Sequence, residues 1–206
     1  MMSTPTPTTA TPTPSRPFGS YNLILKTLAK GKFPHLAGNS LSSVIKLERE
    51  LATSGARLTD AHKNIMAVHS DIEKSLGQAL AKANDAQDRD LMAQHSKISK
   101  DYTDFRGSIQ ESDATYQQLK NKYAEAISTL QAVRKAPADA ANLLQVSQQS
   151  VKNIANDILD YAKKSRLLES NIIKFSDENI ARVFAQHGIR PDIKSRPDLP
   201  QTPQIS

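Results

Sequence analysis

The spacing of apolar residues constrains this chain most, because they recur at alternating steps of three and four along much of its length. The run over residues 98–133 keeps this alternation throughout, and the stretches 41–90 and 140–187 carry it as well. Residues at such steps share one face of a helix, and helices with such faces pack at shallow angles in bundles and coiled coils. The spacing therefore predicts long helices whose apolar faces, which we call heptad seams, are buried against one another.

The eleven prolines mark where those helices can lie. Five fall between residues 5 and 17 and four from Pro191 onward, with only Pro34 and Pro137 between them. A proline inside a helix costs about 3 kcal/mol, so the two proline-free blocks between these residues are the ones that permit long helices.

The expected helix ends follow from turn residues. The polar stretch 84–90 predicts a turn between the first and second helices, and Pro137 predicts the next break, because the residue before a proline avoids the helical region. We expect the third helix to end near Gly188, which suits a left-handed cap and is soon followed by Pro191. The predicted fold is an all-α, elongated, antiparallel three-helix bundle or coiled coil over 35–188.

Both ends of the chain have a different composition. Residues 1–17 are rich in Thr and Pro and nearly free of apolar side chains, and residues 189–206 are also rich in proline. Such segments bury too little surface to offset the entropy of ordering, so we expect a disordered leader and a disordered tail. The start of the chain lacks the apolar region of a secretory signal.

The net charge of +6 is concentrated near the start of the chain. Residues 1–47 carry five basic and no acidic side chains, whereas residues 48–187 carry 19 of each sign. The sequence thus predicts a neutral helical module that carries a basic, acid-free leader.

Within that leader, residues 18–34 form an amphipathic segment. On a helix its apolar and basic side chains lie on different faces, which suits the headgroup region of an anionic membrane. The alternative is that its apolar face packs on the bundle. The candidate lipid contacts of this segment are Phe18, Tyr21, Leu25, Lys26, Leu28, Lys30 and Lys32.

Composition argues against several other classes. The chain has no cysteine, its five histidines form no close metal-binding pattern, and it has no glycine-rich phosphate loop. We therefore expect no enzyme activity, no cofactor and no metal site. The neutral helices carry no nucleic-acid motif, so no nucleic-acid partner is expected. No apolar run approaches the ~20 residues that span a bilayer.

Four short motifs resemble the fungal eisosome core proteins, which are BAR-domain membrane scaffolds. They are the Phe/Gly/Tyr/Leu segment with spaced lysines at 18–33, LSSVIKLER at 41–49, GSIQ at 107–110 and the Lys-x-Pro turn at 135–137. The resemblance implies a BAR-like bundle that forms homodimers and higher assemblies. It also implies binding to anionic lipids, phosphoinositides among them, at the inner face of the plasma membrane.

The resemblance also directs attention to basic residues before and around the GSIQ motif. Lys97, Lys100 and Arg106 are candidate lipid contacts, although only Lys100 falls on the family's basic triad, with Ser96 and Thr103 in the other two places. A further basic cluster at 163–166 is flanked by acidic residues, so intrahelical pairing explains it.

Threonine–proline pairs suggest regulation of the leader. Proline-directed kinases read this context, and each phosphate adds about −1.5 to −2 of charge, so about three would cancel the basic excess of the first 47 residues. The candidate sites are Thr4, Thr6, Thr11, Thr13 and Thr202. The alternative to a membrane scaffold is a soluble coiled-coil adaptor or tether whose basic start docks a protein partner.

Overall fold

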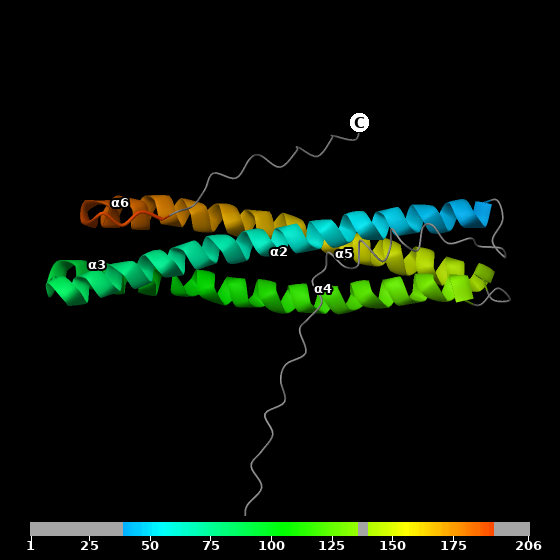
Figure 1. Ribbon diagram of the computed structural model, residues 1–206, viewed down its shortest axis with the longest axis horizontal. Coiled ribbons are helices and arrows are strands. Elements are labelled where there is room, and N and C mark those ends of the chain that lie inside the picture. Colours follow the sequence, from blue (N-terminus) through cyan, green and yellow to red (C-terminus); the bar gives the residue numbers. More distant parts are fainter. Residues whose placement is uncertain (1–38, 136–139, 192–206) are drawn as a thin grey trace, which may run out of the picture.

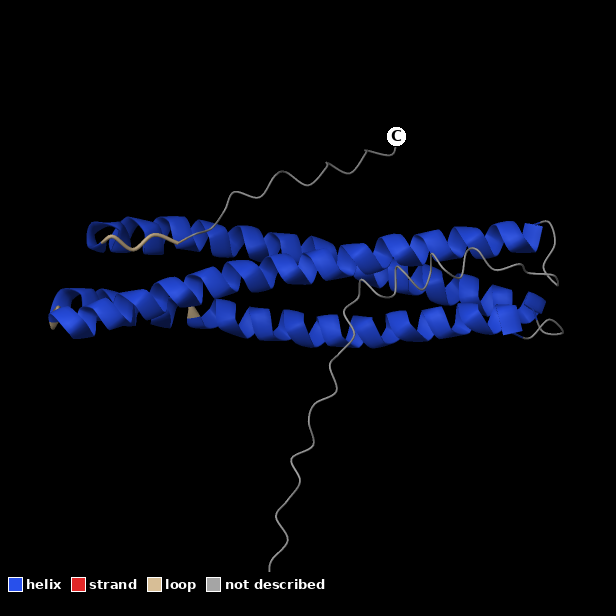
Figure 2. Ribbon diagram, in the orientation of Figure 1, coloured by secondary structure: helices blue, strands red, loops and turns tan. Residues whose placement is uncertain are grey.

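The computed structural model describes residues 39–135 and 140–191, and every regular element in these ranges is helical. The all-helical prediction is therefore confirmed for the described residues. Three long rods account for nearly all of them (Figures 1 and 2). The elements are α2 (Asn39–Ala86), α3 (Arg89–Asp101), α4 (Thr103–Lys135), α5 (Ala140–Phe175), the π-helix η2 (Ser176–Ala181), α6 (Arg182–Phe184) and the 3₁₀ helix η3 (Ala185–His187).

The three rods lie side by side in one elongated bundle, and each runs antiparallel to the rod before it in the chain (Figure 1). The 48 residues of α2 form the first rod, about 70 Å long at 1.5 Å per residue. α3 and α4 return beside it as the second rod, and α5 with the short elements after it forms the third. α5 packs against both α2 and α4. Residues 1–38, which include the segments 1–17 and 18–34, the break at Pro137 and residues 192–206 lie outside the described residues.

The predicted turn at 84–90 is confirmed, and it consists of Gln87 and Asp88. Gln87 adopts φ 51°, and the Asp88 N–H donates to the Ala83 carbonyl at 2.9 Å, which closes the end of α2. Asp88 then caps α3, because its Oδ1 accepts the Leu91 N–H at 3.0 Å. One short turn thus ends one helix and starts the next.

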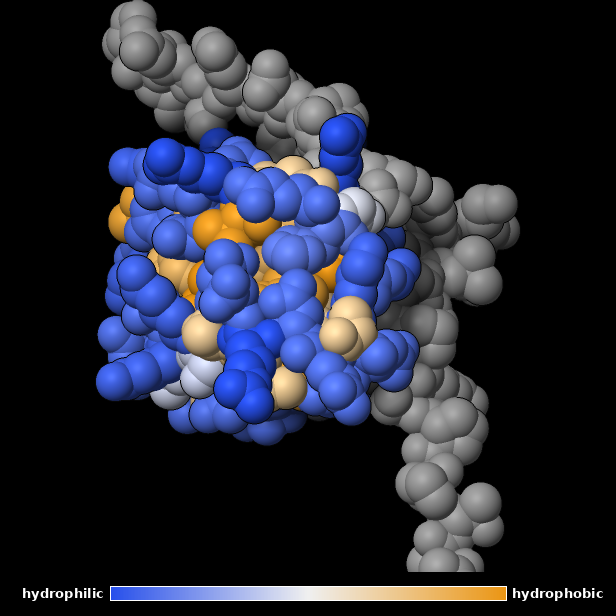
Figure 3. Space-filling model, turned by 90° about the vertical axis from the view of Figure 1, so that its left-hand side faces the viewer, coloured by the Kyte–Doolittle hydropathy of each residue, from blue (hydrophilic) through white to orange (hydrophobic). Residues whose placement is uncertain are grey.

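The third rod ends in a Schellman cap, as Gly188 predicts. Gly188 adopts φ 71°, its N–H donates to Ala185 at 3.0 Å, and the Ile189 N–H donates to Phe184 at 3.1 Å. Ile189 is buried, so the packed module extends one residue past the expected boundary at 188. Lys82, near the end of α2, donates to the His187 carbonyl and so links the first rod to the end of the third. At this end of the bundle, apolar side chains lie inside a border of hydrophilic ones (Figure 3).

One half of the bundle, the regular half, buries residues from 44–58, 116–133 and 151–161. Its heptad seams pack against one another as the spacing predicts. Gly55 brings α2 and α4 together: a Cβ at this position would overlap Tyr123 Oη, which donates to the Leu51 carbonyl at 3.0 Å.

The other half, the junction half, buries residues from 65–83, 91–109 and 172–189. Here the regular pattern changes. Heptad steps place Leu80, four residues after the buried Leu76, on the buried face of α2, but Leu80 is 39% exposed and Ala79 is fully buried instead. In the third rod the buried residues come at steps of four, namely Ile172, Ser176, Ile180 and Phe184, and the wider turns of the π-helix η2 accommodate that spacing.

Most heptad residues of the three rods are buried within the single chain. None of the described helices is long and apolar enough to cross a membrane.

Candidate functional site

The expected lipid contacts fall into two groups. Phe18, Tyr21, Leu25, Lys26, Leu28, Lys30 and Lys32 lie outside the described residues, as do the threonine candidates Thr4, Thr6, Thr11, Thr13 and Thr202. Lys97, Lys100 and Arg106 lie at the junction of α3 and α4, where only Tyr102 separates the two helices.

The helical hydrogen bonds continue through this junction, but in altered form. Tyr102 N–H donates to Ile98 at 2.9 Å, and Arg106 N–H donates to Tyr102 at 3.1 Å. The Ser99 carbonyl also accepts from two side chains, the Thr103 hydroxyl at 3.3 Å and Arg106 Nη1 at 3.1 Å. The Arg106 side chain thus reaches back across the junction from α4 to α3.

Tyr102 anchors the junction to the rest of the bundle. Its ring is fully buried and stacks on Phe105 at 5.8 Å and on Phe175 of α5 at 5.5 Å. Its hydroxyl shares a 3.0 Å hydrogen bond with His69 Nδ1, and burial raises the pKa of that hydroxyl. Burial lowers the pKa of His69, so this ring is favoured in its neutral form.

Arg106 is engaged inside the protein. Its Nε and Nη2 donate to the two carboxylate oxygens of Glu73 at 2.7 and 3.1 Å, and its guanidinium lies 5.3 Å from the centre of the Tyr102 ring. The hydrogen bond from Arg106 lowers the pKa of Glu73, and the same bond raises the pKa of Arg106. This forked geometry gives Arg106 a structural role between α2 and α4.

Lys97 and Lys100 both extend from the exposed side of α3. They lie three residues apart, so they share one side of that helix. The structure thus leaves two of the three candidate cations at the junction accessible, and it holds the third in an ion pair.

A further basic surface lies on α5. Lys152, Lys163 and Lys174 are exposed and separated by 11 residues, close to three helical turns, and Arg166 lies next to Lys163. We call these four residues the α5 basic row. Intrahelical pairing is confirmed for Lys163, whose Nζ lies 3.7 Å from Asp160, and Lys174 lies 3.9 Å from Glu178. Exposed pairs of this kind contribute little, so the row stays available to an external anion. The regular 11-residue spacing is the sequence signal that could have revealed it.

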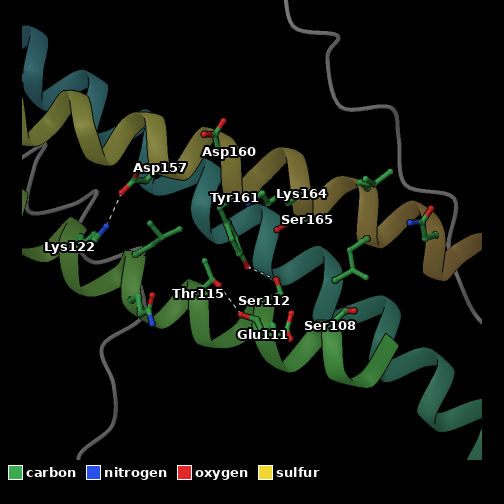
Figure 4. A pocket seen from close by; sticks show the side chains of 15 residues that line it. Ser108, Glu111, Ser112, Thr115, Lys122, Asp157, Asp160, Tyr161, Lys164 and Ser165 are labelled. Atoms are coloured by element: carbon green, nitrogen blue, oxygen red, sulfur yellow. Dashed lines mark hydrogen bonds and ion pairs between the residues drawn. The ribbon is translucent and has the colours of Figure 1, made fainter. Parts of the chain in front are cut away.

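Acidic side chains of α5 line a groove beside that row, and one of them, Asp160, is the partner of Lys163. Asp157 and Asp160 line a groove between α4 and α5, and Glu169 is half-buried. The groove has a volume of about 670 Å³ and runs along the side of the bundle (Figure 4). Lys122 of α4 donates to Asp157 across it at 2.9 Å, and the Ser112 and Tyr161 hydroxyls meet at 3.3 Å. The sequence analysis did not identify this groove.

Among the described residues, no group of three or more histidine, aspartate and glutamate side chains could hold a metal ion. His69 and Glu73, which lie one turn apart, are engaged with Tyr102 and Arg106 instead.

No protein-family model, curated protein or solved structure matches this chain.

Proposed function

We propose that this protein is a peripheral membrane scaffold with a BAR-like bundle, which binds anionic lipid at the cytoplasmic face of the plasma membrane. Phosphoinositides belong to the lipid class that we propose. The observation that carries the proposal is the α5 basic row, which places four exposed cations along one side of an elongated bundle. The first 47 residues, which carry five basic and no acidic side chains, add to it.

The proposed mechanism depends on many weak contacts. Each basic residue near an anionic membrane surface contributes about 1 kcal/mol, so one leader and one row hold the protein only loosely. Two or more associated copies present these contacts together, and avidity then raises the overall affinity. Self-assembly on the membrane would stabilise its curvature along the long axis of the bundle.

Co-sedimentation of the full chain with vesicles tests this function. We expect binding to vesicles that contain phosphatidylserine or a phosphoinositide, weaker binding at high salt, and none to vesicles of phosphatidylcholine alone. Lys163→Gln with Lys174→Gln should weaken binding. The matched control is Lys63→Gln with Lys74→Gln, which removes two exposed lysines at the same spacing from α2.

Equal losses for the two pairs would contradict the role of the α5 basic row. Absence of binding to every vesicle would contradict the membrane function and favour the second candidate, a soluble coiled-coil adaptor. The outward side of α4 favours that candidate, because seven exposed residues at alternating spacing there carry no charge. They are Gly107, Gln110, Ala114, Gln117, Asn121, Ala124 and Ser128.

A further inference from the structure

One side of α2 borders the third rod and carries cations of its own. Lys82 marks this side, because it donates to the His187 carbonyl at the end of that rod. Arg57 and Lys46 lie 25 and 36 residues before Lys82, which correspond to about seven and ten helical turns. Both side chains therefore lie on the side of α2 that borders the third rod, and both are exposed.

The neighbouring side of α5 carries the α5 basic row. Asp157 marks the opposite side, since it pairs with Lys122 of α4 at 2.9 Å. Arg166 follows Asp157 by nine residues, about two and a half turns, so it lies on the side away from α4. Lys152 and Lys163 lie within about 60° of Arg166 around the helix. Because α2 and α5 run in the same direction and pack together (Figure 1), these cations share one face with those of α2, which we call the α2–α5 face.

The junction end of the α2–α5 face carries charges of both signs. Asp60 and Asp71 lie 22 and 11 residues before Lys82, about six and three turns, so they lie on this face of α2. On α5, Lys163 and Lys174 each have an acid of the same rod within 3.7 and 3.9 Å. Much of the positive charge at this end is therefore compensated.

The opposite end of the face, where α2 and α5 begin, has an excess of positive charge. Residues 140–156 contain no acid, and Lys152 has no ion-pair partner among the described residues. Lys46 and Arg57 likewise have none there. The nearest acids of α2 are withdrawn from the surface, namely Glu48, which is buried, and Glu50, which is half-buried.

We infer that this end of the α2–α5 face is the main lipid-binding site, in which Lys46 and Arg57 of α2 act with Lys152 of α5 on the phosphate groups of anionic lipids. The inference rests on the proposed membrane function and adds the residues of a second helix to it. A cation without an acidic neighbour attracts phosphate with its full charge. Arg57 also offers the forked donor geometry that suits phosphate oxygens.

The start of the chain adds charge at the same place. α2 begins at Asn39, and the 38 residues that precede it contain four basic and no acidic side chains. These cations are therefore joined to the bundle at its basic end rather than at the junction end. Contacts from both parts of the chain can then act together on one membrane surface.

Co-sedimentation of the full chain with vesicles of phosphatidylcholine and phosphatidylserine tests the site. Lys46→Gln with Arg57→Gln should weaken binding about 25-fold, because each cation near an anionic surface contributes about fivefold. The matched control, Lys63→Gln with Lys74→Gln, removes two exposed cations at the same spacing from the same helix. These lysines lie about a quarter of a turn away from the face, so the control should lose no more than about twofold.

The α5 pair Lys163→Gln with Lys174→Gln should lose less than the Lys46 and Arg57 pair, because both of its lysines have acidic neighbours. A loss for Lys46→Gln with Arg57→Gln no greater than that of the control would overturn the inference, and so would a greater loss for the α5 pair. In either case, binding by the unaltered chain would leave the proposed membrane function standing. Absence of binding by the unaltered chain would overturn both.

Single-cysteine labels locate the contact without removing a charge. Thr53 lies 29 residues before Lys82, about eight turns, so it lies on the α2–α5 face, whereas Ser70 lies about a third of a turn away from it. Both residues are exposed, and the chain has no cysteine of its own. With a polarity-sensitive dye and the same vesicles, Thr53→Cys should give a blue shift in emission and Ser70→Cys none. No shift at position 53, or an equal shift at both positions, would overturn the inference.

Discussion

The two halves of the bundle each bury a cluster of apolar side chains, but by different means. The regular half follows uninterrupted heptads, and a glycine on α2 lies against a tyrosine on α4, Gly55 against Tyr123. The junction half departs from the heptad: a helix is interrupted at Tyr102, a π-helix follows α5, and aromatic rings and an ion pair fill the space between the rods. Periodicity therefore specifies the first half, and individual side chains specify the second.

The largest expected effect is at the centre of the junction half. Tyr102→Ala removes a fully buried ring and leaves His69 without its hydrogen bond, so we expect a loss of about 3–5 kcal/mol in the free energy of unfolding. Urea unfolding followed by circular dichroism measures it. Tyr102→Phe, which keeps the ring, should cost only about 1 kcal/mol. A loss below about 1 kcal/mol for Tyr102→Ala would show that the junction does not depend on this ring.

The regular half should be most sensitive at Gly55. Gly55→Ala forces its Cβ against Tyr123, so we expect a loss of about 1–3 kcal/mol. Gly77→Ala is the matched control in the same helix: nothing lies within 4 Å of its Cβ, so it should gain about 0.5–1 kcal/mol from helix propensity. Thermal unfolding compares the stabilities of the two variants. A change of stability in the same direction for both would contradict the close approach at Gly55.

Acidification should weaken the junction half. The folded-state pKa of His69 is lowered by burial from 6.5, so the unfolded chain binds a proton at higher pH than the folded chain does. The stability that this neutral ring contributes is complete above the unfolded pKa and is lost as the pH falls below it. We expect the melting temperature to drop between pH 7 and 5, where the lowered pKa values of His62 and His95 act in the same direction.

His69→Gln removes this titration and keeps a hydrogen-bonding group for Tyr102, so the drop in melting temperature over the same pH range should be smaller. An identical pH profile in the variant would exclude His69 as a source of the effect.

The smallest expected effect is in the turn that starts the second rod. Gln87 holds a left-handed backbone conformation, which glycine adopts without strain, so Gln87→Gly should stabilise the protein by up to about 1 kcal/mol. Gln78→Gly, at an exposed position inside α2, should instead cost about 1 kcal/mol. Chemical denaturation measures the change in the free energy of unfolding for both variants, and a loss of stability in Gln87→Gly would contradict the prediction.

Sequence reasoning was most effective where periodicity decides the structure. The rods, the turn at Gln87 and the cap at Gly188 follow from heptads and turn residues alone. The burial of Ala79 in place of Leu80 and the π-helix were missed, because they depend on how a neighbouring rod lies rather than on local spacing.

Much of the candidate site could not be predicted, because it depends on contacts between residues that are far apart in the sequence. Arg106 looks like a free cation in the sequence, but its partner Glu73 lies 33 residues away. The groove exists only because α4 and α5 leave a trough on the side away from α2, which no local pattern encodes. The 11-residue spacing of the α5 lysines was visible in the sequence, but nearby acids suggested intrahelical pairing.

The central claim is that the α5 side of the bundle meets an anionic membrane. Two single-cysteine variants, Asn156→Cys on α5 and Asn121→Cys on α4, replace exposed asparagines and can carry a polarity-sensitive dye. On addition of vesicles that contain phosphatidylserine, the account predicts a blue shift in emission from the label at position 156 and none from the label at position 121. No shift at position 156, or an equal shift at both positions, would contradict it.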